Sequence, residues 1–484
     1  MKEKKSEAPR RGNEELFKWD GNPTFGQMLP LAAQHVLAAV VGCVTPAILV
    51  ANAANNAGGN VNMGLLIQMS LVFAALSTFL QLYGNKIHLG SGLPVIIGVS
   101  FAYVPTMTAI AAQAQDVNTI FGAMIVGGIV AIIVGLTIKQ IRKVFPPLVI
   151  GTVIFAIGLS LYKTAINYMA GNSANTYEVI VEQRGQTAAL VYGSWQNWLV
   201  SLVTLAIVIG LNHYGKGLFK LASILIGLVC GYVLALCFGM VDFSAVVNAS
   251  WFALPKPMHF GIKFEPSSCV AIGVLFAINS IQAIGDFSAT TTGGLDRMPT
   301  DEELNGGIVG YGLSNIVCAF FGGLPTATYS QNVGIVTTTK VINRWVLGLA
   351  AAILGIAGLV PKFSAILTTI PQCVLGGATV SVFASIAMTG MKLVASAEMD
   401  YRNSSIVGLA AALGMGVSQA TAALASFPTW VTTIFGKSPV VLATIIAVML
   451  NVILPKTRDE QKEEAKKKIK IEQKLEEDHR EFGE

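Results

Sequence analysis

Residues 322–340 read GGLPTATYSQNVGIVTTTK, a run rich in glycine, threonine and side-chain amides inside a strongly apolar chain. A bilayer offers no water to backbone N–H and C=O groups, so irregular backbone at membrane depth is tolerated only where it lines a cavity or is buried in protein. The run therefore predicts a broken transmembrane element beside a binding cavity. The alternative is an ordinary loop that leaves the membrane.

A second stretch, in the other half of the chain, is similar to the first. Residues 92–100 read GLPVIIGVS and residues 323–331 read GLPTATYSQ, and the two starts are 231 positions apart. A further pair, PPLVIG at 146–151 and PQCVLG at 371–376, is 225 positions apart. Two similarities at nearly the same offset indicate an internal duplication. Interrupted segments at matching places in two halves point to the binding site of a transporter.

The composition is that of a polytopic membrane protein. Of 484 residues, 53% are hydrophobic and 12% are charged, and the mean hydropathy is +0.63. A soluble domain carries about twice that charged fraction. The chain has no P-loop, HExxH motif or dinucleotide fingerprint, and its six cysteines lack metal-ligand spacing. We therefore expect neither an enzyme nor an ATP-driven pump, with no catalytic residue, metal site, organic cofactor or nucleic-acid partner.

Apolar runs long enough to cross a bilayer divide the chain into four regions. We expect a cytoplasmic N-terminal head at residues 1–27, a first repeat of seven spans at 28–254, a second repeat of seven spans at 255–455, and a charged cytoplasmic tail at 456–484. The two interrupted stretches fall in the third and tenth spans. The head shows no signal-peptide cleavage pattern.

Basic residues gather in alternate loops between the predicted spans. Loops that are cytoplasmic when the N-terminus lies inside contain Lys86, Lys139, Arg142, Lys143, Lys216, Lys220, Arg297, Lys340, Arg344, Lys392 and Arg402. The positive-inside rule then places both termini in the cytoplasm. Because seven is odd, two seven-span repeats must run in opposite senses. The sequence thus predicts an all-α polytopic membrane fold of about fourteen segments in a 7+7 inverted repeat, typical of secondary transporters.

Few ionisable residues lie inside the predicted spans, and each is a functional candidate because such groups are costly in a bilayer. Asp286 lies in the eighth span, and Gln282, four residues earlier, shares its helical face. His35 is the only histidine well inside a span. The alternative role for His35 is a hydrogen bond between helices.

Two facing half-helices would point their N-terminal dipoles at one place near the midplane. Side-chain amides there present a donor beside an acceptor, which suits the edge of a planar heterocycle, and aromatic rings stack on its face. The candidate substrate-binding residues are Gln282, Gln331, Asn332, Ser100, Phe101 and Tyr103. No lysine or arginine lies at depth, so the pattern predicts a small, flat, polar and roughly neutral solute.

Residues 331–340, QNVGIVTTTK, resemble the signature of the nucleobase–ascorbate transporters: Gln, Glu or Pro before Asn-x-Gly, then four residues, Thr, and Lys, Arg or Gly. The resemblance runs from Gln34 and His35 through the twelfth span. It implies core and gate domains and short strands that break spans 3 and 10 at the substrate site. Members carry uracil, xanthine, uric acid or other purines with protons, and some animal members carry ascorbate with sodium.

The resemblance also assigns roles by position. It implies that Gln331 and Asn332 line a purine site, and that Ser100, with Phe101 beside it, sits at a specificity position. With a serine at that position, this chain resembles members that accept uric acid as well as xanthine. His35 matches the family's histidine in span one. We therefore expect an importer of xanthine or uric acid in the cell membrane, coupled to protons or sodium. Family members are often homodimers, although no feature of this sequence shows one.

Two departures from the family pattern bear on coupling. Gln282 stands where proton-coupled members usually have Glu, and Tyr311 aligns with a common Asp. Glutamine can hold the edge of a base but cannot take up a proton. Either Asp286 carries the coupling, with His35 beside it as a second candidate, or the protein is an uncoupled facilitator; we expect symport. An anion transporter on a related fold and a non-transporting scaffold are the remaining alternatives.

Overall fold

The computed structural model describes residues 14–137, 146–172, 177–181, 186–190, 192–428, 431–432, 435 and 439–455. Residues 1–13 of the expected head, the whole expected tail at 456–484, and the basic residues Lys139, Arg142 and Lys143 lie outside these ranges.

Helices make up most of the described chain. The first half contains α1 (Phe25–Asn56), α2 (Met63–Tyr83), α3 (Val104–Ala114), α4 (Asn118–Leu136), α6 (Pro147–Met169), α7 (Trp195–Tyr214), α8 (Leu218–Leu221), α9 (Ser223–Cys237) and α10 (Ser244–Asn248). The second half contains α11 (Pro266–Leu295), α12 (Asp301–Phe321), α13 (Ser330–Thr339), α14 (Arg344–Gly358), α15 (Pro361–Thr368), α16 (Gln372–Ala395), α17 (Tyr401–Gln419) and α19 (Pro439–Ile453). Short 3₁₀ turns occupy Glu14–Phe17, Gly84–Ile87, Phe101–Tyr103 and Thr421–Leu424.

The helices are those of a multi-pass membrane protein. Within the described ranges, eight helices are long and apolar enough to cross a bilayer, and the pair α14 and α15, bent by 78°, makes a ninth candidate. The other apolar segments are shorter helices or are broken, as α3 and α13 are. The polytopic, mainly helical class expected from composition is therefore confirmed.

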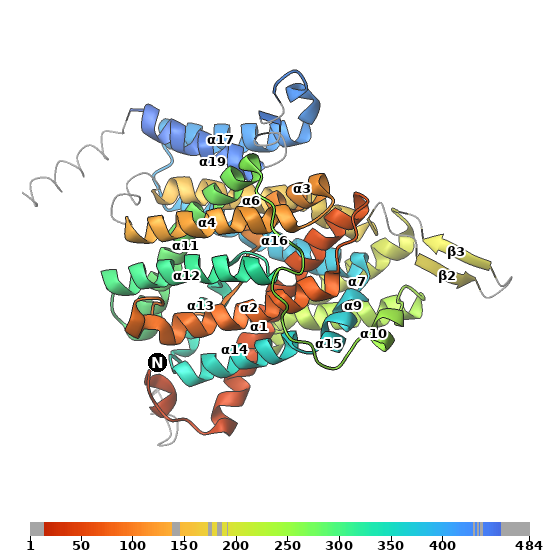
Figure 1. Ribbon diagram of the computed structural model, residues 1–484, viewed down its shortest axis with the longest axis horizontal. Coiled ribbons are helices and arrows are strands. Elements are labelled where there is room, and N and C mark those ends of the chain that lie inside the picture. Colours follow the sequence, from red (N-terminus) through yellow and green to blue (C-terminus); the bar gives the residue numbers. More distant parts are fainter. Residues whose placement is uncertain are drawn as a thin grey trace, which may run out of the picture.

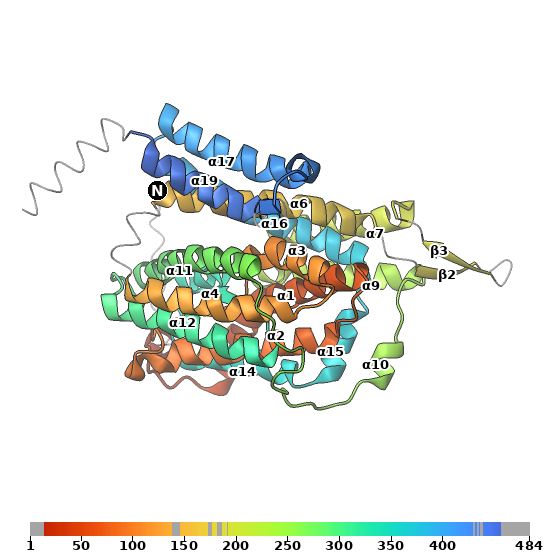
Figure 2. The same ribbon diagram turned by 45° about the horizontal axis from the view of Figure 1, so that its top comes forward.

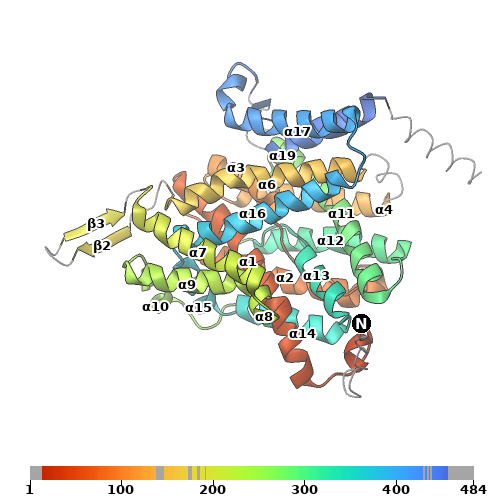
Figure 3. The same cartoon turned by 180° about the vertical axis from the view of Figure 1, so that it is seen from behind.

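The helices form two groups. In the first, α4 packs against α11 and α12, and α2 packs against α12 and α14. In the second, α6 lies along α16, α7 along α9, and α17 along α19 (Figure 1). The turned view in Figure 2 shows α17 and α19 as an outer layer beside α6 and α16. From behind, α6, α16 and α7 run together across the second group (Figure 3).

A β-hairpin that the sequence did not lead us to expect projects from one end of the bundle, opposite the end that carries the N label (Figure 1). Its strands β2 (Tyr177–Val181) and β3 (Gln186–Leu190) pair antiparallel, with Tyr177 opposite Leu190. It joins α6 to α7. The sequence did not predict it because a short extended segment outside the spans gives only a weak periodic signal.

Two three-residue strands lie in the first group, at the two similar stretches. Strands β1 (Ile97–Val99) and β4 (Thr326–Thr328) pair antiparallel, with Gly98 opposite Ala327. The pairing continues beyond both ends, where Ser100 N donates to Pro325 O and Tyr329 N donates to Ile96 O. The two strand segments cross in the interior of the protein. Each then continues into a short helix, β1 into α3 and β4 into α13.

Neighbouring side chains satisfy the strand backbone that the two-stranded pairing leaves free. The Thr78 hydroxyl, on α2, accepts from Ile97 N at 3.0 Å and faces Ile97 O at 3.2 Å. The Asn315 amide, on α12, accepts from Thr326 N at 2.8 Å and donates to Thr326 O at 3.3 Å. Each strand thus has a polar partner on a flanking helix, as buried backbone in a membrane protein requires.

Local sequence explains how α12 leads into the crossing. The helix begins with a capping box, in which Thr300 and Glu303 bond each other's backbone N–H groups at 2.8–3.2 Å. It ends at Gly322, whose φ of 79° is the left-handed conformation typical of a glycine after a helix. The chain then turns through Leu324 and Pro325 into β4.

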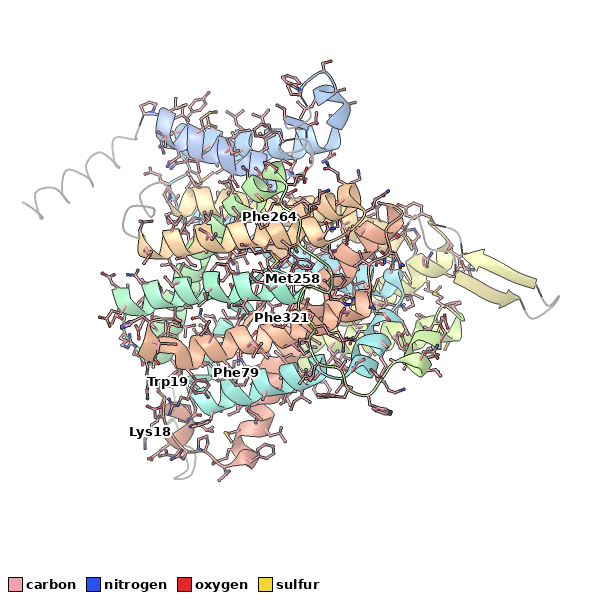
Figure 4. The ribbon with its side chains drawn as sticks, in the orientation of Figure 1. Lys18, Trp19, Phe79, Met258, Phe264 and Phe321 are labelled. Carbon is pink, nitrogen blue, oxygen red and sulfur yellow. The ribbon has the colours of Figure 1, made fainter. Side chains whose placement is uncertain are left out.

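The N-terminal segment is fastened to the start of α14. Asn343 is fully buried, and its side-chain amide lies 2.9–3.0 Å from the carbonyl oxygens of Glu15, Lys18 and Gly21. Arg344 N donates to Trp19 O at 3.2 Å. Figure 4 labels Lys18 and Trp19 at this end of the bundle. The ordered segment therefore fixes the chain just before α1.

Candidate functional site

A buried carboxylate lies where α11 meets the end of β4. Asp286 is 7% exposed, and it accepts hydrogen bonds from the hydroxyls of Thr328 and Ser330, the latter at 2.7 Å. Thr328 ends β4 and Ser330 begins α13, so the carboxylate faces the N-terminus of a half-helix, where negative charge is favoured. Among the described residues, Asp286 is the only buried carboxylate and pairs with no lysine or arginine.

The second contact of α13 ties it to α1. The Asn332 side-chain nitrogen lies 3.0 Å from both His35 Nδ1 and the His35 backbone oxygen. Because that carbonyl can only accept, the facing Asn332 atom must be the amide nitrogen, and His35 Nδ1 accepts in turn. The imidazole therefore carries no proton on Nδ1 in this arrangement. Asn332 Oδ1 is buried without a hydrogen-bond partner, which leaves one acceptor in the site unsatisfied.

Two glutamine side chains beside the carboxylate are free. Gln282, partly exposed, lies one helical turn before Asp286 on α11, and Gln331, exposed, follows Ser330 on α13. Neither amide makes a hydrogen bond to another part of the described chain. Both therefore have a donor and an acceptor available for a ligand beside Asp286.

The other half-helix presents Ser100 and Phe101. Ser100 is half-buried, and its hydroxyl accepts from Ala102 N at 3.2 Å, so it caps the turn that leads into α3. Phe101 is 9% exposed, and its ring meets that of Phe383, on α16, edge to face at 5.6 Å. Phe101 thus belongs to the first group of helices but contacts the second, which places the site at the boundary between the groups.

Tyr103 backs the site and does not line it in this conformation. Its side chain is fully buried, its hydroxyl bonds the Tyr311 hydroxyl, and its ring lies 5.0 Å from that of Phe276. The stacking role expected for Tyr103 would need a different side-chain position. Tyr311, the residue aligned with an Asp in the family pattern, is likewise buried, at 1% exposed, and its hydroxyl is engaged in this hydrogen bond to Tyr103.

Five of the eight candidate residues lie around the first turn of α13: Gln282, Asp286, Gln331, Asn332 and His35. Sequence reasoning missed Thr328, Ser330 and Phe383. The two hydroxyls lie within the first stretch discussed above, but only their contact with Asp286, 42 and 44 positions away, distinguishes them from other polar residues there. Phe383 is one of many apolar residues in its helix and has no sequence signal.

A family model described as "Permease family" (Xan_ur_permease) matches residues 26–423, most of the chain and all of this site. This chain belongs to the nucleobase–ascorbate transporter family. A family member of this kind is a transporter and not an enzyme.

Curated relatives of the family match over nearly their whole length. The xanthine permease XanQ of Escherichia coli (strain K12) is 30% identical over 463 residues, covering 93% of this chain and 96% of that protein. The uric acid permease PucJ of Bacillus subtilis (strain 168) is 32% identical over 405 residues, covering 83% of this chain and 87% of that protein.

Solved structures share the fold at low sequence identity. The transmembrane domain of a cyanobacterium bicarbonate transporter, BicA, superposes with a TM-score of 0.52 at 16% identity, covering 87% of this chain and 97% of that one. SLC26A9 gives a TM-score of 0.55 at 11% identity, covering 89% of this chain and 66% of that one. At these identities the likeness shows the architecture alone.

Proposed function

We propose that this nucleobase–ascorbate transporter imports a purine nucleobase, xanthine or uric acid, by symport with a proton. The observation that carries the proposal is the pair of free amides, Gln282 and Gln331, beside the buried carboxylate of Asp286. Curated relatives named as xanthine and uric acid permeases support the purine class.

The substrate would bind between the half-helix ends. Each glutamine amide offers a donor beside an acceptor, which matches the N–H and C=O groups along the edge of an oxopurine. The unsatisfied Asn332 Oδ1 would accept a further N–H from the base. The ring would lie near Phe101, at the boundary with Phe383. Ser100, half-buried beside Phe101, would set the size and polarity of that end.

Transport would proceed by alternating access between the two groups of helices. We assign α1–α4 and α11–α14 to a core that carries the site, and α6, α7, α9, α16, α17 and α19 to a gate. In this scheme residues 28–254 and 255–455 form two inverted seven-span repeats, fourteen spans in all. The matched starts of α6 and α16, each one residue after a proline N-cap, support this assignment.

The loops bearing Lys86, Arg297 and Lys340 follow α2, α11 and α13, at the end of the bundle that carries the N label in Figure 1. We assign that end to the cytoplasm and the protein to the plasma membrane, because basic loops remain on the cytoplasmic side.

Asp286 would carry the coupling proton. Its carboxylate is held by two hydroxyl donors and no cation, so protonation removes a buried charge and weakens both bonds to β4 and α13. How firmly Asp286 holds the start of α13 would then depend on whether the proton is bound. His35 would act by holding Asn332, since its Nδ1 accepts from that amide.

An uncoupled facilitator is the second candidate. Gln282 and Tyr311 occupy positions where the family pattern has acids, and the Tyr311 hydroxyl is committed to Tyr103. On this reading Asp286 is a structural cap for α13.

The first experiment is a substrate profile. Proteoliposomes that contain the purified protein are loaded with unlabelled xanthine, uric acid, uracil or ascorbate in separate batches. Entry of the same compound in labelled form is then followed by counterflow, which needs no coupling ion. Counterflow of xanthine or uric acid supports the proposed substrate class. Counterflow of uracil or ascorbate alone contradicts it.

A further inference from the structure

A hollow of about 700 Å³ lies between α3 of the proposed core and α6, α17 and α19 of the proposed gate. Its lining begins at Pro105, in the first turn of α3 and four residues beyond Phe101. The volume is in the range of small-molecule sites. In the proposed topology α3, α6 and α17 all end on the outer side, so the hollow lies toward the outside of the bundle.

Among the described residues, the lining of the hollow has one cation and several hydroxyls. Lys163, exposed on α6, makes no hydrogen bond or ion pair with any described residue. Three lining hydroxyls, those of Thr108, Ser160 and Ser418, already donate to carbonyls of their own helices at 2.7–2.8 Å. These three hydroxyls therefore offer lone pairs only, whereas the Tyr162 and Thr164 hydroxyls, also in the lining, bond no described residue and can donate. The described lining residues include no carboxylate.

We propose that this hollow is an outer recognition site for a purine monoanion, with Lys163 as its charge partner. The inference rests on the proposed function and extends it to the charge state of the substrate. A urate-type monoanion carries a delocalised negative charge for the ammonium and ring N–H groups for the acceptor hydroxyls. An inorganic anion or a lipid phosphate has no N–H donors to use those acceptors.

This position separates charge recognition from purine recognition. No described lysine or arginine is bonded to Asp286 in the central site, and a buried carboxylate there disfavours an anion. A lysine near the outer end of α6 raises the local concentration of the anion without adding a fixed positive charge to the central site. The charge of Lys163 should therefore alter the apparent affinity for an anionic purine and leave a neutral one unaffected.

The test uses initial rates of uric acid and xanthine uptake into proteoliposomes at mildly acidic pH, where uric acid is largely a monoanion and xanthine is neutral. We expect Lys163→Gln to raise KM for urate about threefold, leave its kcat unchanged, and leave KM for xanthine unchanged. Lys163→Arg should behave as wild type. Lys256, exposed in the loop between α10 and α11, lies on the outer side in the proposed topology but outside the hollow, and Lys256→Gln should change neither KM.

A wild-type measurement guards against a misfolded variant. Raising the ionic strength should raise KM for urate and leave KM for xanthine unchanged, because salt screens an exposed charge. Equal changes for the two purines, or no change for urate, would overturn the inference while uptake by the wild-type protein upholds the proposed function. Loss of the Lys163→Gln effect in vesicles without anionic lipid would assign the lysine to a headgroup and also overturn it. Failure of the wild-type protein to carry either purine overturns the proposed function itself.

Discussion

The side-chain nitrogen of Asn332 lies 3.0 Å from Nδ1 of His35 and 3.0 Å from its backbone oxygen, so one amide joins the half-helix α13 to the first helix of the chain. Asn332 thus orients the N-terminus of α13, whereas its neighbour Gln331 points an unbonded amide outward. Adjacent residues of the family signature therefore have different surroundings, and we expect them to have different tasks.

Substitutions of the two residues should therefore have different effects on transport and stability. Gln331→Ala should raise KM for the purine about tenfold and leave the melting temperature unchanged, because the exposed side chain makes no hydrogen bond to a described residue. Asn332→Ala should reduce transport and also destabilise the protein by about 1–3 kcal/mol, since the bonds to His35 disappear. Uptake kinetics and thermal unfolding in detergent measure the two effects. Equal melting temperatures for both variants would contradict the assignment.

Asp286→Asn should abolish accumulation driven by a proton gradient and preserve exchange. Asparagine keeps the size of the side chain and one acceptor for the hydroxyls of Thr328 and Ser330, but it does not titrate. We expect gradient-driven uptake to fall to the equilibrium level while counterflow continues. Retained accumulation would exclude Asp286 as the proton carrier.

Gln282→Glu restores the acid of the family pattern at a position whose side chain makes no hydrogen bond to a described residue. If Asp286 alone couples transport, the variant should still accumulate purine, with a changed pH dependence of the rate. If the wild-type protein is a facilitator, the variant should gain accumulation that the wild type lacks. Gln282→Asn, which shortens the side chain and adds no acid, is the control.

Gly98→Ala should damage the crossing of the strands. A Cβ at Gly98 would lie 2.6 Å from Tyr329 Cζ and 2.8 Å from Cys43 Sγ, in a core with no room for either to move. We expect a loss of about 1–3 kcal/mol in stability, read as a lower melting temperature. Gly408→Ala, on α17, has nothing within 4 Å of the new Cβ and is the matched control. A melting temperature as high as that of the control would show that the strands can separate at little cost.

The N-terminal fastening at Asn343 predicts a local effect. Asn343→Asp keeps the acceptor for Trp345 N but removes the donors to three carbonyls of the segment before α1. We expect faster hydrogen exchange in residues 14–24 and a loss of about 1–3 kcal/mol in stability. Glu14→Gln, on the same segment and exposed, should change neither. Unchanged exchange in the Asn343 variant would show that the segment is held by other contacts.

Most of the residues that gather around the start of α13 could be predicted from the sequence because their chemistry is local. Three patterns are visible in the sequence, and each is unusual in an apolar chain. They are the polar stretch after Gly322, the similar stretch that begins at Gly92, and the four-residue spacing of Gln282 and Asp286. These patterns do not reveal which residue each polar side chain is hydrogen-bonded to. Asp286 meets Ser330 and Asn332 meets His35 across 44 and 297 positions, which no period or spacing predicts.

Burial is the other property that the sequence did not supply. Phe101 and Tyr103 are two positions apart and both aromatic, yet one contacts α16 and the other is sealed behind Tyr311. The 3₁₀ turn Phe101–Tyr103 sends the two rings in different directions, and only the backbone reveals that turn. The hairpin β2–β3 was missed because a short extended segment outside the spans gives a weak periodic signal.

The central claim is coupled purine transport, and its most direct test is uptake of radiolabelled xanthine and uric acid with and without an imposed inward proton gradient. We predict accumulation above equilibrium only with the gradient, and its loss in Asp286→Asn. Uptake of either purine that stops at equilibrium in both conditions would contradict symport and establish a facilitator.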